Sequence, residues 1–119
     1  MRINMDLGDF GEEKACKYLT KNNYEIIERN FRCKQGEIDI IAKDTSKNEL
    51  VFIEVKTRSS FQYGRPSDAV NNFKKRHIIS ASKYYIYKNN LNSSYIRFDV
   101  IEIFPQDYSF KINHLKQIL

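Results

Sequence analysis

The chain has 119 residues, of which 41% are hydrophobic and 29% charged. This length suits one domain, 1–119, and this composition predicts a folded chain rather than a disordered one. No apolar run approaches the roughly 20 residues that a membrane helix requires. The N-terminus lacks the apolar segment of a signal peptide, and the two cysteines and two histidines show no zinc-motif spacing. We therefore expect a cytoplasmic protein with no membrane partner.

Apolar spacing divides the chain into helical and extended segments. Residues 6–22 carry apolar side chains at helical spacing, and a second helix opens at Pro66-Ser67-Asp68. The predicted strands are residues 24–33, 36–42, 50–57 and 95–104. The last residues form a short strand or a tail. The order α-β-β-β-α-β predicts an α/β fold in which helices flank a central mixed sheet.

Charged side chains interrupt two of the apolar strands. Glu54 and Lys56 lie two residues apart on one face of the third strand, about 6.6 Å along it. Asp39 interrupts the preceding strand, and in a hairpin it would lie opposite Glu54. Two such carboxylates repel each other and raise a pKa. One interpretation is a structural salt bridge from Lys56 to Glu54 or Asp39.

The other interpretation is a metal site with catalytic chemistry. Asp39, Glu54, the backbone carbonyl of Val55 and several waters are suitable ligands for Mg²⁺. Such an ion polarises a phosphoryl oxygen and makes a bound water more acidic. The ammonium of Lys56 would position that water or offset charge that builds up on the phosphate.

Basic residues are concentrated in one part of the chain. Residues 56–88 carry eight basic side chains and one acid, a net charge of +7, whereas the remainder has a net charge of −2. A confined basic field is what a polyanion-binding surface needs, although a solvated basic helix has the same composition. Arg58, Lys74 and Arg76 are the candidate phosphate contacts, with ordinary solvent exposure as the alternative for each.

The charged strands belong to a longer pattern. The segment Gly36-Glu37-Ile38-Asp39, followed by Ile53-Glu54-Val55-Lys56-Thr57-Arg58, resembles the Asp…Glu-x-Lys core of the restriction-endonuclease-like PD-(D/E)XK superfamily. The flanking motifs are Gly11-Glu12, Arg29-Asn30-Phe31-Arg32, Gly64-x-Pro66, Ala69-Val70 and Arg97-Phe98-Asp99-Val100. Over about residues 8–101, the chain therefore resembles the YraN family of predicted endonucleases, which is similar in fold to archaeal Holliday-junction resolvases.

The resemblance implies a restriction-endonuclease-like core and a role for each charged residue. Asp39 and Glu54 would be metal ligands, Lys56 the catalytic lysine and Glu12 an auxiliary acid from the first helix. The implied cofactor is Mg²⁺, with Mn²⁺ as the other candidate. The implied substrate is DNA, branched or single-stranded, and the two-fold symmetry of junctions suggests a homodimer.

Three hypotheses follow for function. The first is a metal-dependent endonuclease that hydrolyses phosphodiester bonds. The second is a non-catalytic nucleic-acid-binding module on the same fold, and the third is a protein-interaction adaptor in which the carboxylates form structural salt bridges. Stabilisation by Mg²⁺ separates the third from the first, because an ion that binds only the native state raises its stability.

Overall fold

The computed structural model describes residues 7–58, 72–91 and 95–119, with all their side chains except those of Leu7 and residues 72–75. The elements are α1 (Leu7–Lys21), β1 (Tyr24–Cys33), β2 (Gly36–Asp44), β3 (Glu49–Thr57), α2 (Asn72–Lys88), β4 (Tyr95–Pro105) and β5 (Phe110–Leu115). The predicted order is confirmed, and the C-terminal segment adds strand β5. The predicted opening of the second helix, at Pro66-Ser67-Asp68, lies outside the described residues.

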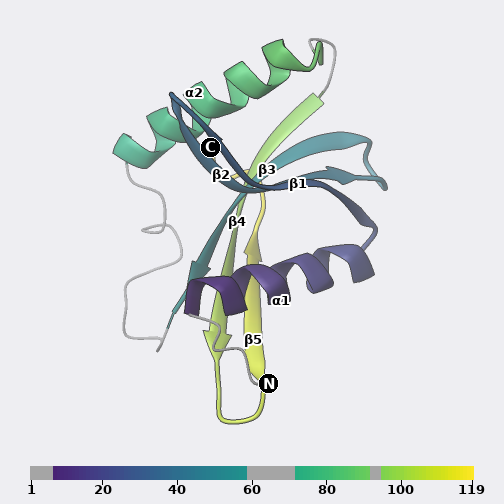
Figure 1. Ribbon diagram of the computed structural model, residues 1–119. Helices are drawn as coiled ribbons and strands as arrows, with labels where there is room; N and C mark the ends of the chain where they lie inside the picture. Colours follow the sequence, from purple (N-terminus) through teal and green to yellow (C-terminus); the bar gives the residue numbers. More distant parts are fainter. Residues whose placement is uncertain (1–6, 59–71, 92–94) are drawn as a thin grey trace, which may run out of the picture.

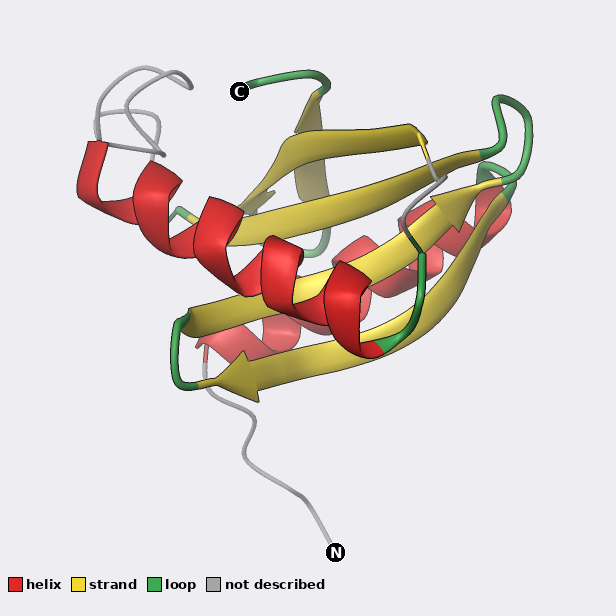
Figure 2. Ribbon diagram, turned by 90° about the horizontal axis from the view of Figure 1, so that it is seen from above, coloured by secondary structure: helices red, strands yellow, loops and turns green. Residues whose placement is uncertain are grey.

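The strands form one mixed sheet in the order β1-β2-β3-β4-β5. Neighbouring strands are antiparallel except β3 and β4, which are parallel. The two helices lie on opposite faces of this twisted sheet (Figures 1 and 2). No helix in the described parts of the chain is long and apolar enough to cross a membrane. The α/β fold with a central mixed sheet is confirmed and is consistent with a restriction-endonuclease-like core.

Strand alternation divides the apolar side chains between two cores. Under α1, Ala15 and Leu19 pack on Ile53 of β3 and on neighbouring strand residues. Under α2, Ala81 and Tyr85 pack on the opposite face, against Phe31, Ile41 and Phe52. Val51, Ile53 and Val55 of β3 all lie on the α1 side, as the period-two alternation of a strand requires.

Helix α1 approaches β3 so closely that a Cβ atom on Gly11 would collide with Oγ1 of Thr57. We expect Gly11→Ala to lower the free energy of unfolding by about 1–3 kcal/mol through overpacking, against the helix propensity of alanine. Gly8→Ala, at an exposed position of the same helix, is the control and should be neutral or up to about 1 kcal/mol stabilising. Urea unfolding measures both, and equal stabilities would contradict this packing.

Strand β2 turns about its own axis at Asp39. Ile40 packs in the core under α1 and Ile38 in the core under α2, although residues two apart in a regular strand face the same side. On the neighbouring strand β1, Asn30 has a φ of 51°. It lies across from Asp39, but the two are not paired in the β1–β2 ladder. The β2–β3 ladder ends at Ile40 and Ile53. The backbone is therefore irregular where the candidate site begins.

Arg97 of β4 is the centre of a buried ionic network beneath α1. Its side chain is 1% exposed and donates to both carboxylate oxygens of Asp99 at 2.9 to 3.2 Å. It also donates to Asp44 and to Glu49, each at 2.9 Å, and to the hydroxyl of Tyr24 at 2.6 Å. One guanidinium thereby ties β4 to the ends of β1, β2 and β3.

A second set of hydrogen bonds links this network to β5 and α1. His114 Nε2 lies 2.7 Å from Asp99 Oδ2, and His114 Nδ1 lies 2.8 Å from the hydroxyl of Tyr18. The backbone N–H of Gln117 also donates to Asp99, at 3.2 Å. The side chains of Tyr18, His114, Asp99 and Arg97 are thus all hydrogen-bonded to one another in series, as buried polar groups require.

The network predicts loss of stability in acid. Burial acts to raise the pKa of Asp99, but hydrogen bonds with His114 and Arg97 outweigh it and hold the pKa below its ordinary value. A carboxyl with a depressed folded-state pKa contributes stability that is complete above its unfolded pKa of about 3.9 and is lost as pH falls through the folded value. We therefore expect the free energy of unfolding to decline below about pH 4.

Urea titrations at several pH values measure this decline. Asp99→Asn should be less stable at neutral pH and should show a shallower acid decline, because the variant lacks the carboxyl that must be protonated. Equal slopes in wild type and Asp99→Asn would contradict a contribution from Asp99.

Candidate active site

The three predicted core residues meet where β2 and β3 separate. Continuing the β2–β3 register beyond Ile40 and Ile53 brings Asp39 level with Glu54. In place of a further ladder bond, the backbone N–H of Val55 donates to Oδ2 of Asp39 at 2.8 Å. The strand backbone therefore orients the Asp39 carboxylate toward β3.

The electrostatics at Asp39 are those expected of crowded carboxylates. Burial, followed by the negative charge of Glu54, raises the pKa of Asp39 to about 7. The charges of Glu12 and Glu37 act in the same direction, and the hydrogen bond from Val55 opposes them. The site thus gathers acids from α1, β2 and β3, and their charges together with burial outweigh this hydrogen bond at Asp39.

Lys56 forms an ion pair with Glu54 in this structure. Its Nζ lies 3.2 Å from Glu54 Oε1, and the two side chains are 24% and 13% exposed. This is the salt bridge considered from the sequence, and it holds the ammonium beside the carboxylate pair. A partly exposed lysine on a four-carbon stem remains able to turn toward an anion.

Glu12 extends from α1 toward the bend in the β1–β2 hairpin. Burial raises its pKa, and the nearby Arg29 and the Asn30 side chain act to lower it. Because Glu12 also raises the pKa of Asp39, it lies close enough to influence the site. Its role as an auxiliary acid stays a prediction.

The predicted phosphate contacts have different surroundings. Arg58 is 20% exposed, and its side chain forms an ion pair with the buried Glu102 at 3.4 Å, so it is not the freely solvated arginine considered as an alternative. Arg76 is exposed on α2, next to His77, which packs against Gly36 at the start of β2. Gly36 has a φ of +153°, which favours glycine there. The Lys74 side chain lies outside the described residues.

The donor set suits a hard cation bound partly by water. In the described ranges, no group of three or more His, Cys, Asp and Glu side chains converges as a metal cage. Mg²⁺ commonly uses only one or two protein carboxylates and keeps several waters. Asp39 and Glu54, whose mutual repulsion a cation would relieve, fit that requirement, and the Val55 backbone lies beside them.

Two features, one at the site and one on the far flank of α1, were not found from the sequence. The left-handed conformation of Asn30, where β2 bends, had a weak signal, because asparagine adopts positive φ more readily than most residues. Lys14, Lys17 and Lys21 form a basic stripe on α1. Their spacing of three and four residues would place them on one side of a helix. The acidic residues of the same helix offset their charge, so the net charge of the segment did not reveal the stripe.

Comparison with known proteins identifies the family. Residues 11–103 match the model of the family described as "Uncharacterised protein family UPF0102". A UPF0102 protein of Clostridioides difficile (strain 630) is 47% identical over 112 residues, which cover 94% of this chain and 95% of the relative. One of Clostridium botulinum (strain 657 / Type Ba4) is 51% identical over 114 residues, covering 92% and 91%.

A UPF0102 protein of Caldicellulosiruptor saccharolyticus is 48% identical over 99 residues, covering 83% of this chain and 82% of the relative. The matched segment contains Glu12, Asp39, Glu54 and Lys56. These matches also confirm the resemblance to the YraN family. The chain therefore belongs to the UPF0102 family.

Proposed function

We propose that this protein is a metal-dependent endonuclease that hydrolyses phosphodiester bonds in DNA. The observation that carries the proposal is the meeting of Asp39 and Glu54 at the end of the β2–β3 ladder, with Lys56 held 3.2 Å from Glu54. Burial of Asp39, followed by the charge of Glu54, raises the pKa of Asp39 to about 7. A carboxyl whose pKa is shifted by burial and by a specific charged neighbour is a candidate for a functional site.

Each residue has a distinct part in this proposal. Asp39 and Glu54 would hold Mg²⁺ or Mn²⁺, with the Val55 carbonyl as a further ligand. A bound ion would supply Lewis-acid polarisation of the phosphate and a more acidic water. Lys56 would turn from Glu54 to offset charge developing on the phosphate, and Glu12 would help to orient water on the α1 side.

The proposed substrate is branched or single-stranded DNA, in the cytoplasm, as the family resemblance implies. Arg58, Lys74 and Arg76 would contact the backbone from the end of β3 and the start of α2. Such contacts position a nucleic acid without reading its sequence. A homodimer would match the two-fold symmetry of a junction.

A non-catalytic nucleic-acid-binding module is the second candidate. It is favoured by one observation, namely that Lys56 and Arg58 are both paired with acids of this chain, Glu54 and Glu102. In a module of this kind the pairs would be structural, and nucleic-acid binding would not depend on a divalent cation.

A cleavage assay tests the proposal. The substrates are a four-way junction, a flap, a single strand, a linear duplex and RNA, each with Mg²⁺, with Mn²⁺ and with EDTA. Metal-dependent cutting that Glu54→Gln removes would support an endonuclease and identify its preferred substrate. Equal cutting by wild type and Glu54→Gln from the same purification would indicate a contaminant. Binding without cutting would favour the second candidate.

Addition of Mg²⁺ should raise the melting temperature. An ion present at 100 times its Kd adds about 2.7 kcal/mol to the stability of the native state, or about 6–12 °C for a domain near this size. Asp39→Asn should lose most of this shift, because one of the two carboxylates becomes neutral. Glu25→Gln, at an exposed position of β1, is the control. A wild-type melting temperature unchanged by Mg²⁺ and by Mn²⁺ would contradict the metal site.

A further inference from the structure

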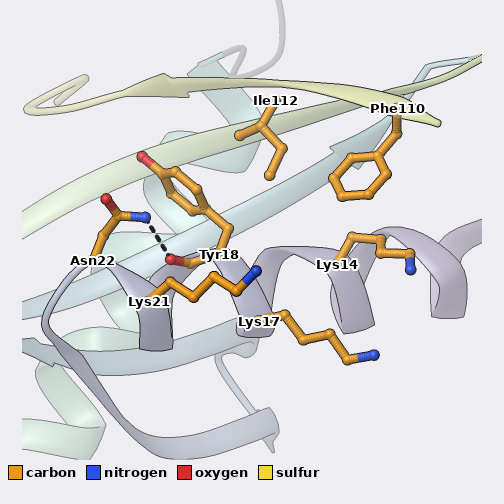
Figure 3. A pocket seen from close by; sticks show the side chains of 7 residues that line it. All are labelled: Lys14, Lys17, Tyr18, Lys21, Asn22, Phe110 and Ile112. Carbon is orange, nitrogen blue, oxygen red and sulfur yellow. Dashed lines mark hydrogen bonds between the residues drawn. The ribbon is translucent and has the colours of Figure 1, made fainter.

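A groove runs between α1 and β5 on the flank of the helix away from Glu12. It has a volume of about 330 Å³ and is lined on the helix side by Lys14, Lys17 and Lys21, with Phe110 and Ile112 of β5 opposite. Figure 3 shows the three lysines projecting from successive turns of α1 and the two apolar side chains lying across from them. Because β1 and β5 are opposite edges of the sheet, this groove and Glu12 are on opposite sides of the helix.

The charge of the groove is uniformly positive. Lys14, Lys17 and Lys21 follow helical i, i+3 and i+7 spacing and so form one stripe, roughly 10 Å long. None of the described residues that line the groove is acidic, whereas Glu12 and Glu13 lie on the other flank of the helix, where Glu13 pairs with Arg29. Helix α1 thus presents acids toward β1 and lysines toward β5.

Aromatic rings form the wall at one end of the groove. Phe10 of α1 meets Phe110 edge to face, with centroids 6.2 Å apart. Nζ of Lys14 lies 5.4 Å from the centroid of Phe10 and 5.3 Å from that of Phe110. Tyr108, in the β4–β5 turn, is fully exposed and lines the adjoining hollow. The three lysines therefore adjoin a cluster of aromatic rings at this end of the groove, and Asp107 is the one acid among the described residues that line the adjoining hollow.

We propose that this groove binds a single-stranded segment of nucleic acid. Proteins that bind single strands without reading sequence combine a positive groove with aromatic rings on which bases stack, and both elements are present here. The three lysines offer three positive charges along roughly 10 Å of helix to the phosphates of such a strand. A cavity of about 330 Å³ is at the lower end of the range for small-ligand pockets, which suits unpaired bases better than a double helix.

The groove and the candidate active site lie on two sides of the N-terminal turns of α1. Gly11, next to Phe10, packs directly on Thr57, and Thr57 follows Lys56 in β3. The first turns of α1 therefore separate the lysines of the groove from the carboxylates. The inference rests on the proposed function only in taking nucleic acid as the ligand. Binding in the groove requires neither hydrolysis nor a metal.

Fluorescence anisotropy tests the groove with a labelled 15-nucleotide oligo(dT), the full chain and EDTA. We expect Lys17→Gln/Lys21→Gln to weaken binding roughly tenfold and to lower the slope of log K against log salt by about 1.4, because about 0.7 is lost for each single-strand phosphate contact. The control Lys43→Gln/Lys47→Gln removes the same charge from exposed positions around the β2–β3 turn and should change binding less than twofold. Phe110→Leu, which keeps apolar bulk, should weaken binding about fivefold through lost stacking.

The possible outcomes are distinct. Equal losses in the groove and control variants, or no loss in either, would overturn the proposal. Lysine-dependent binding to anionic vesicles or to poly-glutamate, without binding to oligo(dT), would assign the groove to another partner and also overturn it. Because EDTA abolishes only metal-dependent steps, a failed cleavage assay with intact groove binding would count against the nuclease alone, and the reverse result would count against the groove alone.

Discussion

Glu54→Gln and Lys56→Met are each expected to lower the rate of metal-dependent cleavage at least 100-fold. Glutamine keeps the shape of the side chain but removes the charge that a hard cation prefers. Methionine keeps an apolar stem in the place of Lys56 but cannot offset charge on the phosphate, a loss that typically costs a factor of 10² to 10³. Single-turnover rates on the preferred substrate measure both effects.

Matched controls separate chemistry from folding in this experiment. Glu25→Gln and Lys43→Met make the same chemical changes at exposed positions on β1 and β2, and both should cleave at wild-type rates. The ion pair between Lys56 and Glu54 is partly exposed, so its loss should cost only about 1 kcal/mol of stability. Variants that unfold, rather than remaining folded and inactive, would favour the structural salt bridge.

Arg97→Met is expected to lower the free energy of unfolding by about 3–5 kcal/mol. Removing one partner of a buried ionic network leaves the remaining charges buried without an opposite charge. This loss destabilises a protein much more than replacing the whole network with apolar side chains would. The Asp99 side chain is fully buried and the Asp44 side chain is 5% exposed. Water therefore cannot solvate either carboxylate after the guanidinium is removed. Arg97→Lys should lie between wild type and methionine, because lysine keeps the charge but not the planar fork.

Urea unfolding midpoints measure the Arg97 variants, and an exposed ion pair provides the comparison. Arg32 pairs with Glu37 at 3.4 Å, but its side chain is 76% exposed, so Arg32→Met should change stability by less than about 1 kcal/mol. Equal losses of stability in Arg97→Met and Arg32→Met would show that the burial of Arg97 does not determine how much its ion pairs stabilise the fold.

Most of the fold was predictable because local spacing determines it. The apolar stripe in residues 6–22 and the period-two alternation in β3 are local signals, and the polar segment between β2 and β3 indicated their hairpin. The mixed sheet was predicted, but the register and neighbours of β4, which is parallel to β3 and antiparallel to β5, were not, because they depend on residues far apart in sequence. For the same reason the network of Arg97 was missed, since Asp44 and Tyr24 lie 53 and 73 residues away in sequence.

The candidate site was predictable where hairpin geometry sufficed. The juxtaposition of Asp39 with Glu54 follows from the register, which the β2–β3 pairing confirms as far as Ile53. The twist of β2 about its own axis at Asp39 could not be predicted, because the alternation rule assumes that the strand is regular. The partner of Arg58 was also unpredictable, since Glu102 belongs to β4.

The irregularity of β1 has a consequence for encounters between molecules. Among the described strands, β1 forms one edge of the sheet and is ten residues long, and a flat edge of that length would serve as a template for a strand of another chain. Its pairing shifts at Ile27, Asn30 turns left-handed, and the charged Glu28 and Arg29 between them are exposed. A foreign strand could not keep its ladder through this stretch, so the edge of β1 is protected against aggregation.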